Sequence, residues 1–230
     1  MAFLVIEGLD GSGKSTQIKL LREHLDKSRI NYKYLHFPRT GSGLFGDLIS
    51  GFLRGELGEI DEVNPYLVAL MYAADRHNAK SEMVKWLSDG HLLLADRYVM
   101  SNVAFQCAKT DTAGQKRILR EWIFNVEYLN YGIPRPDLSI FLDVPFEFTR
   151  EKLGNSRSGN ERNYLKGKQD IHEADLNFQK KVRQEYLEQA KNEENLRIIS
   201  CYNEEEGMLK PEKIFDRIMG MLKDENLIPQ

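Results

Sequence analysis

A short stretch near the start of the chain, GLDGSGKST at residues 8–16, contains the residue types that bind the phosphates of a nucleotide. Its spacing matches G-x-x-x-x-G-K-[ST] without a gap. In such a loop the glycines turn backbone N–H groups toward phosphate oxygens, the lysine reaches the β- and γ-phosphates, and the hydroxyl binds Mg²⁺. The candidate phosphate-binding residues are Gly8, Gly11, Ser12, Gly13, Lys14, Ser15 and Thr16, with Ser15 also a candidate metal ligand.

The residues that flank this loop predict the strand and the helix that such a loop needs. FLVIE at 3–7 is a short apolar run that suits a buried parallel strand. After the loop, Ile18, Leu21 and Leu25 recur at helical spacing. The positive end of that helix would add to the attraction for phosphate. Because Lys14 should contact phosphate only in the complex, we expect its side chain to face solvent in the empty protein.

Length, charge and cysteine content restrict the class of protein. A chain of 230 residues is most simply one α/β domain, and we expect a single P-loop kinase domain over 1–230. A net charge of −3 and a pI of about 6.0 give no indication of nucleic-acid binding. No apolar run has the length of a membrane span, and the first residues do not resemble a secretion signal. Cys107 and Cys201 form neither a disulfide framework nor a metal cluster, which favours a reducing cytoplasm.

Apolar runs alternate with longer amphipathic segments along the whole chain. This alternation predicts a three-layer fold, with a five-stranded parallel sheet covered by helices on both faces and a small lid. We expect strands at 3–7, 32–37, 91–96, 138–144 and 196–201. We expect helices at 14–27, 64–88, 115–130, 171–194 and 211–223.

One stretch departs from this alternation, GNSRSGNERNYLKGK at 154–168. It is polar and poor in large aliphatic residues. Six basic residues and two acidic ones lie between Arg150 and Lys168. A solvated loop is one interpretation. The other is a mobile lid that brings positive charge over a phosphate.

The string DTAGQ at 111–115 occurs near the γ-phosphate in small GTPases, but here we interpret it differently. In a GTPase this aspartate ends a strand, whereas the preceding FQCAKT does not read as one. The guanine-reading pattern N-K-x-D is absent from the sequence. We therefore expect 109–115 to be a loop that leads into a helix starting near Gln115.

Three arginines follow expected strands or lie on an expected helix, where a second phosphorylated substrate would bind. HFPR contains Arg39, MYAADR contains Arg76, and ADRYVMSNVAFQ contains Arg97. Ligands of open α/β sheets bind beyond the carboxyl ends of the strands. Forked guanidinium groups suit a phosphate or a polar base edge. Tyr72 and Phe105 could stack on a flat ring or wall it; the alternatives are a surface ion pair for Arg76 and core packing for the aromatic residues.

With these pieces in order, the chain resembles the thymidylate kinase family over roughly residues 3–220. The matching elements are EGLDGSGKST, FPR, YAADR, DRYVMSNVAFQ, PRPDLSIFLDV and DIHEADLNFQKKVRQEYL. The combination of the phosphate loop with DRYxxSxxAFQ is the specific part. The resemblance implies transfer of the γ-phosphate of ATP to dTMP, giving dTDP and ADP on the way to dTTP, with Mg²⁺ and in a homodimer. It also makes the Phe37–Pro38 peptide bond a candidate for cis.

The family implies roles for residues around the acceptor's sugar and phosphate. Asp10 would hold the 3′-hydroxyl, and Arg39 and Arg97 would bind the dTMP phosphate. Asp96 would help to hold Mg²⁺ through water. Phe105 would pack below the sugar, where a 2′-hydroxyl would clash.

The family also implies roles around the base. Phe37 would line the cleft, and Tyr72 would stack on thymine. Arg76 would contact the edge of the base, and Gln106 would reach it as well.

Two departures from the family pattern concern the catalytic arginine. Some members carry an arginine in the phosphate loop, where this chain has Gly11. Others carry it in an R-[FIY]-E-like lid motif, where this chain has DIHE, with Asp170 at the position of the arginine. The lid arginine would then be Arg157 or Arg162, and we assign the role to the two jointly.

Two other kinds of function remain open from the sequence. A kinase for a deoxynucleoside or a different nucleotide is the nearest, and Glu7 could be the carboxylate base that a nucleoside kinase needs near the end of its first strand. A P-loop protein that switches with nucleotide and turns over little is the other, with DTAGQ as its only support. Three arginines on the acceptor side favour a phosphorylated acceptor.

Overall fold

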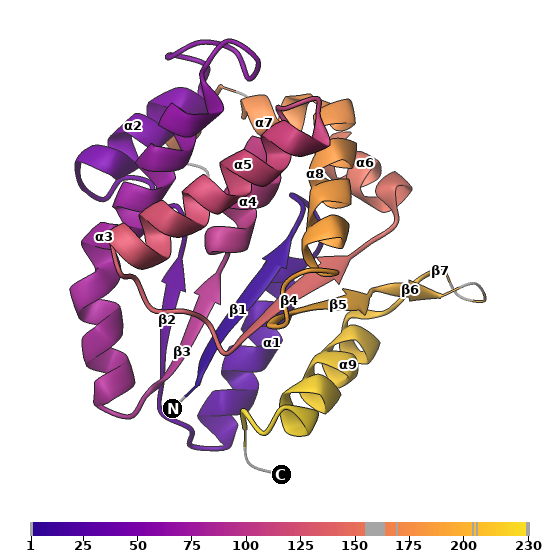
Figure 1. Ribbon diagram of the computed structural model, residues 1–230. Coiled ribbons are helices and arrows are strands. Elements are labelled where there is room, and N and C mark those ends of the chain that lie inside the picture. Colours follow the sequence, from indigo (N-terminus) through magenta and orange to yellow (C-terminus); the bar gives the residue numbers. More distant parts are fainter. Residues whose placement is uncertain (1, 155–163, 169, 204, 206, 229–230) are drawn as a thin grey trace.

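A five-stranded parallel sheet forms the centre of the molecule (Figure 1), as predicted. The computed structural model describes residues 2–154, 164–168, 170–203, 205 and 207–228. The strand order is β2-β3-β1-β4-β5, so the strand that leads into the phosphate loop lies in the middle. Each strand lies within one residue of the predicted bounds. The strands are β1 (Phe3–Gly8), β2 (Tyr32–His36), β3 (Leu92–Asp96), β4 (Leu138–Asp143) and β5 (Leu196–Ser200).

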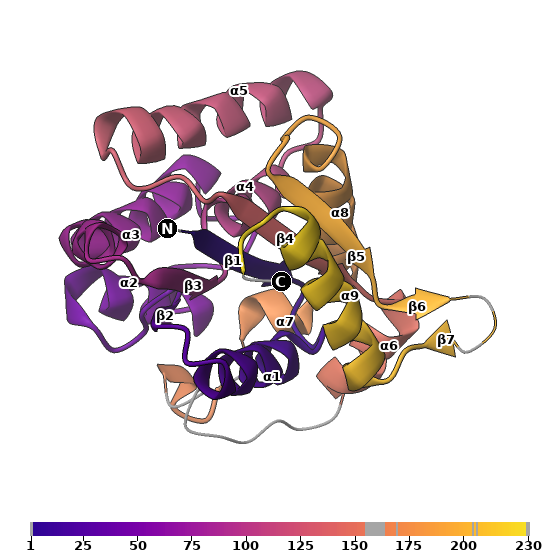
Figure 2. The ribbon, with the colours of Figure 1, turned by 90° about the horizontal axis from the view of Figure 1, so that it is seen from below.

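Helices cover both faces of the sheet, because alternate side chains of β1 enter two separate cores. Leu4 and Ile6 pack with α1 and α9 on one face. Phe3 and Val5 pack with α3, α4 and α5 on the other. Figure 2 shows these two groups of helices on either side of the strands. These helices are α1 (Lys14–Lys27), α3 (Pro65–Ser88), α4 (Val99–Cys107), α5 (Ala113–Phe124) and α9 (Pro211–Asp224).

Two predicted helices are divided in the structure. The segment expected at 115–130 begins earlier, at Ala113, and after Phe124 it continues as a π-helical turn over Asn125–Asn130. The segment expected at 171–194 is two helices, α7 (Ile171–Ala174) and α8 (Leu176–Gln189). Asp175 separates them because its side chain accepts hydrogen bonds from the first backbone N–H groups of α8.

Three helices and a hairpin in the structure were not predicted from the sequence. All nine residues of α4 are buried, so it lacks the one-sided apolar pattern by which helices are recognised. In α2, three glycines and one serine interrupt the apolar pattern, so this helix was not recognised either. The missed elements are α2 (Gly43–Leu53), α4, α6 (Phe146–Gly154) and the hairpin of β6 (Tyr202–Asn203) and β7 (Gly207–Met208).

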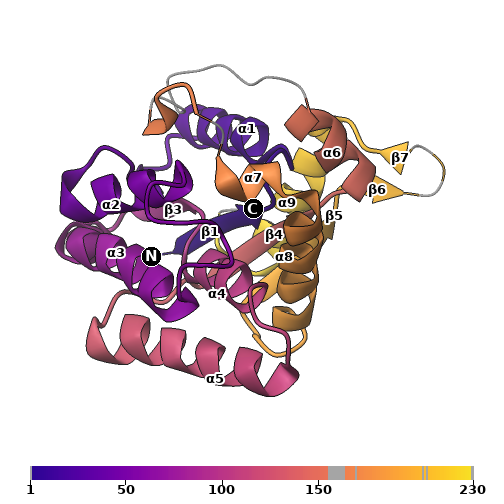
Figure 3. The ribbon, with the colours of Figure 1, turned by 90° about the horizontal axis from the view of Figure 1, so that it is seen from above.

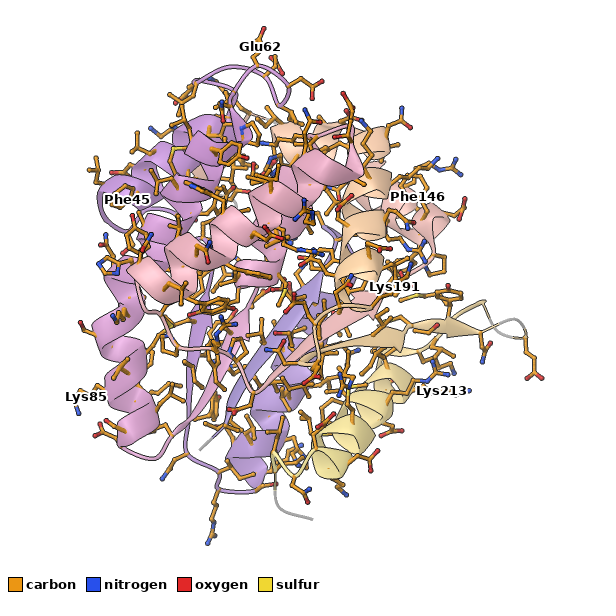
Figure 4. The ribbon with its side chains drawn as sticks, in the orientation of Figure 1. Phe45, Glu62, Lys85, Phe146, Lys191 and Lys213 are labelled. Carbon is orange, nitrogen blue, oxygen red and sulfur yellow. The ribbon has the colours of Figure 1, made fainter. Side chains whose placement is uncertain are left out.

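The carboxyl edge of the sheet is surrounded by α2, α6 and α7 (Figure 3). Charged side chains such as Glu62 and Lys85 point away from the body of the molecule (Figure 4). Of the predicted lid at 154–168, residues 155–163, including Arg157 and Arg162, lie outside the described residues. No helix within the described part of the chain is both long and apolar enough to cross a membrane.

Candidate active site

The phosphate loop joins the end of β1 to the start of α1, as the motif requires. Gly13 has φ 85°, a left-handed conformation that favours glycine, and it stands at the N-cap of α1 without a side-chain capping bond. The first N–H groups of α1 are therefore available to an anion. A Cβ atom at Gly8 would lie 2.5 Å from the Ser12 hydroxyl oxygen, so a side chain there would displace the Ser12 hydroxyl.

Lys14 does not face solvent, which corrects the expectation from the sequence. Its side chain is 8% exposed, and Nζ donates to the carbonyl oxygens of Gly8 at 3.2 Å and Leu9 at 2.9 Å. Burial, followed by the charge of Arg97, lowers the pKa of Lys14 to about 8. The ammonium group thus rests on the loop's own carbonyl groups, in a position where phosphate oxygens would be stronger partners.

Asp96 ends β3 beside the phosphate loop and fits a role in holding Mg²⁺. It is 5% exposed, and one carboxylate oxygen lies 3.2 Å from Nδ1 of His36. The other oxygen is buried without a hydrogen-bond partner among the described residues. Burial would raise the pKa of Asp96, but the His36 hydrogen bond and the charge of Lys14 lower it, so Asp96 is anionic. A buried carboxylate oxygen without a partner, together with the exposed hydroxyl of Ser15, is a donor set that suits a hard cation.

Arg97, the next residue, has φ 63°, an uncommon conformation for a side chain of this size. Its backbone N–H donates to Ile6 of β1, and its Nη2 donates to Asp10 of the phosphate loop at 2.7 Å. Its guanidinium carbon lies 5.2 Å from the centre of the Phe105 ring. Strained backbone is retained where the surroundings impose it, often at functional sites. The structure therefore brings Asp10, Arg97 and Phe105 together, as predicted.

Glu7 has a structural role that weakens the nucleoside-kinase alternative. It is 0% exposed, and it accepts hydrogen bonds from the backbone N–H groups of Tyr98 at 2.9 Å and Ser101 at 3.3 Å. The hydroxyls of Ser101 and Tyr186 donate to it as well. Burial raises its pKa. Because four donors hold Glu7 against the start of α4, its carboxylate is not free to act as a base on a sugar hydroxyl.

Phe105 forms one wall of an aromatic group between α4 and α7–α8. It is 7% exposed, and its ring lies 5.0 Å from that of His172 and 5.9 Å from that of Phe178. Burial keeps the pKa of His172 well below its ordinary value, so its imidazole is neutral. The Arg97 guanidinium carbon lies 5.2 Å from the centre of the same ring, so Phe105 connects this aromatic group to the arginine beside the phosphate loop.

Tyr72 on α3 is half-buried and packs on the small apolar cluster that includes Ile49 and Phe52. Burial raises the pKa of its hydroxyl, and the charges of Asp170, Arg97 and Arg76 are close enough to affect it. Tyr72 therefore lies in the same region as the acceptor-side arginines.

Arg39 and Phe37 lie on the loop after β2, which contains the predicted cis Phe37–Pro38 bond. Arg39 Nε donates to Oδ1 of Asp75 at 3.0 Å, and its Nη2 donates to the carbonyl of Asp75 at 2.8 Å. Phe37 is 1% exposed and packs on Tyr98 in the core, with the Arg39 guanidinium 6.0 Å from its ring centre. Phe37 was expected to line the substrate cleft. In the structure it is buried in the core, with its ring beneath the Arg39 guanidinium, and does not line an open cleft.

Arg76 is buried, so the surface ion pair considered from the sequence is wrong. Its side chain is 2% exposed and that of Glu127 is 0% exposed. Nε donates to Oε2 of Glu127 at 2.8 Å, and Nη2 donates to Oε1. Burial would lower the pKa of Arg76, but the nearby Glu127 carboxylate raises it, so the guanidinium group is charged.

Asn102 on α4 joins this pair. Its Nδ2 donates to Glu127 at 2.9 Å and to the carbonyl of Ala69 at 3.0 Å, and its buried Oδ1 has no partner among the described residues. Gln106, one turn later on the same face of α4, is 1% exposed, and its Oε1 also lacks a partner there.

Asp170 occupies the position that aligns with the family's lid arginine. As a buried acidic residue, it cannot supply the positive charge that the arginine would provide. It is 5% exposed, caps α7 through the backbone N–H of His172, and accepts a hydrogen bond from the Tyr164 hydroxyl at 2.8 Å. Burial, and after it the charge of Asp10, raises its pKa to about 7. Asp170 therefore closes the acceptor region with a carboxyl group that is largely neutral below neutral pH.

The GTPase-like string has a purely local role. Thr112 caps α5 by accepting from the N–H of Gln115, and the Gln115 side chain accepts from the N–H of Thr112. This reciprocal arrangement is a capping box. The interpretation of 109–115 as a loop before a helix is correct, with the helix beginning two residues earlier than expected.

With this geometry in place, comparison with known proteins decides the family. A family model described as thymidylate kinase matches residues 6–210. The chain belongs to the thymidylate kinase family. Members of the thymidylate kinase family are nucleoside monophosphate kinases, so the predicted family and enzyme class are confirmed.

Curated relatives of the thymidylate kinase family match over most of their length. A probable thymidylate kinase of Pyrococcus abyssi is 30% identical, covering 98% of this chain and 97% of its own. One of Pyrobaculum aerophilum is 33% identical, covering 84% and 85%. The thymidylate kinase of Mycobacterium tuberculosis H37Rv is 30% identical, covering 81% and 85%.

Among solved structures, the thymidylate kinase of Candida albicans has the same fold. Its TM-score is 0.69 at 24% sequence identity, covering 98% of this chain and 92% of that chain. At this identity the similarity supports the architecture, and it agrees with the predicted P-loop kinase fold.

Three residues of this site were not found by sequence reasoning. Glu127 accepts hydrogen bonds from Arg76 and from Asn102, and Gln179 of α8 donates to Asp10 at 3.4 Å. A signal was present for Glu127, since it is a lone acidic residue between the large apolar residues Val126 and Tyr128. Asn102 lies inside the DRYVMSNVAFQ element, but nothing in its spacing distinguishes it from a residue of the core.

Proposed function

We propose that this protein transfers the γ-phosphate of ATP to dTMP. One observation carries the proposal: Arg97, the residue after β3, reaches across to Asp10 in the phosphate loop after β1. Because β1 and β3 are neighbouring strands, a donor phosphate in the loop and an acceptor phosphate on Arg97 would lie side by side. Phosphoryl transfer requires this positioning more than it requires covalent chemistry.

On the donor side, the loop amides and Lys14 would hold the β- and γ-phosphates of ATP. Ser15 and Asp96 would hold Mg²⁺, which neutralises charge on the phosphates when it is bound. An open cavity of about 610 Å³ between α6 and the β6–β7 hairpin, lined in part by Phe148 and Met208, would take the nucleoside of ATP. The other residues of the phosphate loop that would bind ATP are Gly8, Gly11, Ser12, Gly13 and Thr16.

On the acceptor side, Arg97 and Arg39 would exchange their present carboxylate partners for the dTMP phosphate. Asp10 would then be released to the 3′-hydroxyl of the sugar. Phe105 would support the sugar from below, with no polar partner for a 2′-hydroxyl. The acceptor is itself an anionic oxygen, so the reaction needs no general base.

Around the base, Tyr72 would stack on the thymine ring, and Arg76 and Gln106 would meet its edge. The buried carboxyl of Asp170, whose pKa is raised to about 7, would close this side of the cleft.

Arg157 and Arg162 are proposed, from the sequence alone, to supply the positive charge that the phosphate loop lacks. Arginines with this role contribute about 10³–10⁵ in rate in related phosphoryl-transfer enzymes. Replacing each by alanine, alone and together, should lower kcat far more than it raises the KM for dTMP. Near-normal kcat in the double variant would assign the role elsewhere.

The test of the function is a panel of nucleoside monophosphates with ATP and Mg²⁺. We expect dTMP to be the best acceptor. Ribothymidine monophosphate should be poorer by roughly one to two decades in kcat/KM, because its extra hydroxyl would be buried without a partner. Turnover with a deoxynucleoside, or none with any monophosphate, would favour the nucleoside-kinase or the nucleotide-switch alternative.

We also propose that the enzyme is a cytoplasmic homodimer that binds neither nucleic acid nor membrane. Exposed apolar side chains on the neighbouring helices α3 and α5, among them Leu67 at 61% and Ile118 at 53%, support a face that another chain covers. Cys107 and Cys201 are free and buried, as is usual in a reducing compartment. Light scattering on the purified protein measures the number of subunits.

A further inference from the structure

The ion pair of Arg76 and Glu127 is the most deeply buried in the described part of the molecule, and its position needs an explanation. A buried pair is weak evidence for stability, because removing two charges from water offsets most of their attraction. Here the carboxylate serves three donors with two oxygens: Nε and Nη2 of Arg76 and Nδ2 of Asn102. One acidic side chain thus fixes two side chains from two different helices, α3 and α4.

The backbone conformation around Glu127 places its side chain between α3 and α4. The π-helical turn Asn125–Asn130 extends α5 with one additional residue in its turn, and Val126, Glu127 and Tyr128 are all buried. Leu129, the next residue, is 73% exposed. The turn therefore directs Glu127 toward α3 and α4. π-turns of this kind occur frequently at functional sites.

The chemistry of a carboxylate also fixes which way round the Asn102 amide lies. An ionised carboxylate only accepts hydrogen bonds, and so does the carbonyl of Ala69. Both contacts require the NH₂ end of Asn102, so the atom left over must be the acceptor Oδ1. This oxygen is the one that is buried without a partner among the described residues.

We propose that Glu127 is a positioning residue that sets the choice of base, by holding Arg76 as a donor and Asn102 as an acceptor beside each other. The inference rests on the proposed function and specifies its acceptor. Thymine and uracil present an acceptor, O4, next to a donor, N3–H. Cytosine presents the reverse, an amino group next to a bare N3. The pair held by Glu127 matches the first pattern and opposes the second.

The experiment is a competition assay in which one enzyme sample phosphorylates dTMP and dCMP, or dTMP and dUMP, in the same tube with ATP and Mg²⁺. The ratio of products gives the ratio of kcat/KM and does not depend on how much enzyme is folded. In Glu127→Gln, one acceptor atom becomes a donor, so one of the three donors loses its partner. The preference for dTMP over dCMP should fall by about tenfold or more, as loss of a buried matched hydrogen bond implies.

The dUMP arm is an internal control. Uracil has the same N3–H and O4 as thymine, so the ratio of dTMP to dUMP should stay within about threefold of the wild-type ratio. A variant that loosens the whole pocket would change both ratios, and that outcome would overturn the proposal. Unchanged preference for dTMP over dCMP in Glu127→Gln would overturn it as well.

Two further variants complete the test. Glu185→Gln makes the same chemical change in another interhelical ion pair, with Lys116 at 2.6 Å, and should leave both ratios unchanged. Asn102→Ala removes the proposed acceptor and keeps the Arg76–Glu127 pair, so it should also lose preference against dCMP. If Glu127→Gln is not recovered folded, Asn102→Ala decides, and full retention of the preference in it contradicts the proposal.

The competition assay separates this inference from the function on which it rests. Wild-type enzyme that transfers no phosphate to dTMP would refute the proposed function. Wild-type transfer with a preference that Glu127→Gln retains would refute only the role of Glu127.

Discussion

Two arginine–carboxylate pairs at opposite ends of the acceptor site differ in a way that matches what each must do. Arg76 and Glu127 are 2% and 0% exposed, and the carboxylate has a further donor in Asn102. Arg97 and Asp10 are 11% and 24% exposed, and Arg97 lies on strained backbone. The first pair is enclosed within packed helices, whereas the second joins two loops at the edge of the sheet.

The difference indicates that the base end is built before the ligand arrives and that the phosphate end holds temporary partners. At the phosphate end, Lys14 rests on loop carbonyls and Arg97 rests on Asp10. Anionic phosphates are better partners for these cations than the protein groups they have now. At the base end, any exchange of partners would leave a charge buried and unpaired, which is costly.

The largest expected effect concerns stability at the base end. Glu127→Ala should lower the free energy of unfolding by about 3–5 kcal/mol, because Arg76 would stay buried without its partner. Asp10→Ala, at the phosphate end, should change it by about 1 kcal/mol or less. Urea unfolding of both variants measures the contrast, and equal losses in the two would contradict it.

The next effect concerns catalysis at the phosphate end. Lys14→Met keeps the apolar stem and removes the charge, and we expect kcat/KM to fall by about 10²–10³-fold, as for loss of one transition-state donor. Because burial lowers the pKa of Lys14, the charged form is disfavoured in the empty enzyme, so the variant should be at least as stable as the wild type. Steady-state kinetics and thermal unfolding test the two parts, and wild-type turnover would exclude the phosphate-loop assignment.

A smaller effect concerns Asp170, between the two ends. Its pKa is about 7 in the folded protein against an ordinary 3.8, so wild-type stability falls as pH rises between these values. Asp170→Asn removes this dependence and keeps the cap of α7. It should therefore match the wild type at low pH and exceed it by about 1–3 kcal/mol above neutral pH.

Unfolding of Asp170→Asn by urea on both sides of neutral pH measures this. Asp175→Asn, which changes the exposed cap of α8, is the matched control. A difference from the wild type that is the same at both pH values would show that Asp170 is not the titrating group.

The smallest effect is on the affinity for ATP. Lys14, with a pKa of about 8 in the empty enzyme, should bind phosphate in its protonated form. The dissociation constant for ATP should therefore rise by about five- to tenfold between about pH 7 and about pH 9. Calorimetric titration at several pH values measures the slope. Lys14→Met should lack it, and a slope that persists in this variant must come from another group.

The contrast between the two ends also explains which parts of the site the sequence revealed. The residues of the phosphate end lie in or near the phosphate-loop motif. The spacing of Gly8, Gly13 and Lys14 in that motif is imposed by the shape of a phosphate group. The buried strands were found for a related reason, because continuous apolar runs in a parallel sheet have few alternatives.

The base end depends on contacts between distant segments, which no local pattern records. Arg76 and Glu127 are 51 residues apart in sequence, and the π-turn that brings them together was hidden inside an ordinary helical pattern. The exposure expected of Lys14 was wrong for a similar reason. The motif specifies the ligand of the lysine but not where the side chain rests without it. Helix α4 was missed because it is buried on every side.

The position of β1 in the middle of the sheet also has a consequence for how the chain assembles during synthesis. The phosphate loop leaves the ribosome before β3 and β4, yet β1 pairs Phe3 with Leu93 on one side and Leu4 with Leu138 on the other. Contacts so distant in sequence form slowly, since a long loop must close before any of them is made. The strand that carries the loop therefore gains its second neighbour only after β4 has been translated. A nascent chain stalled before β4 should accordingly bind no nucleotide.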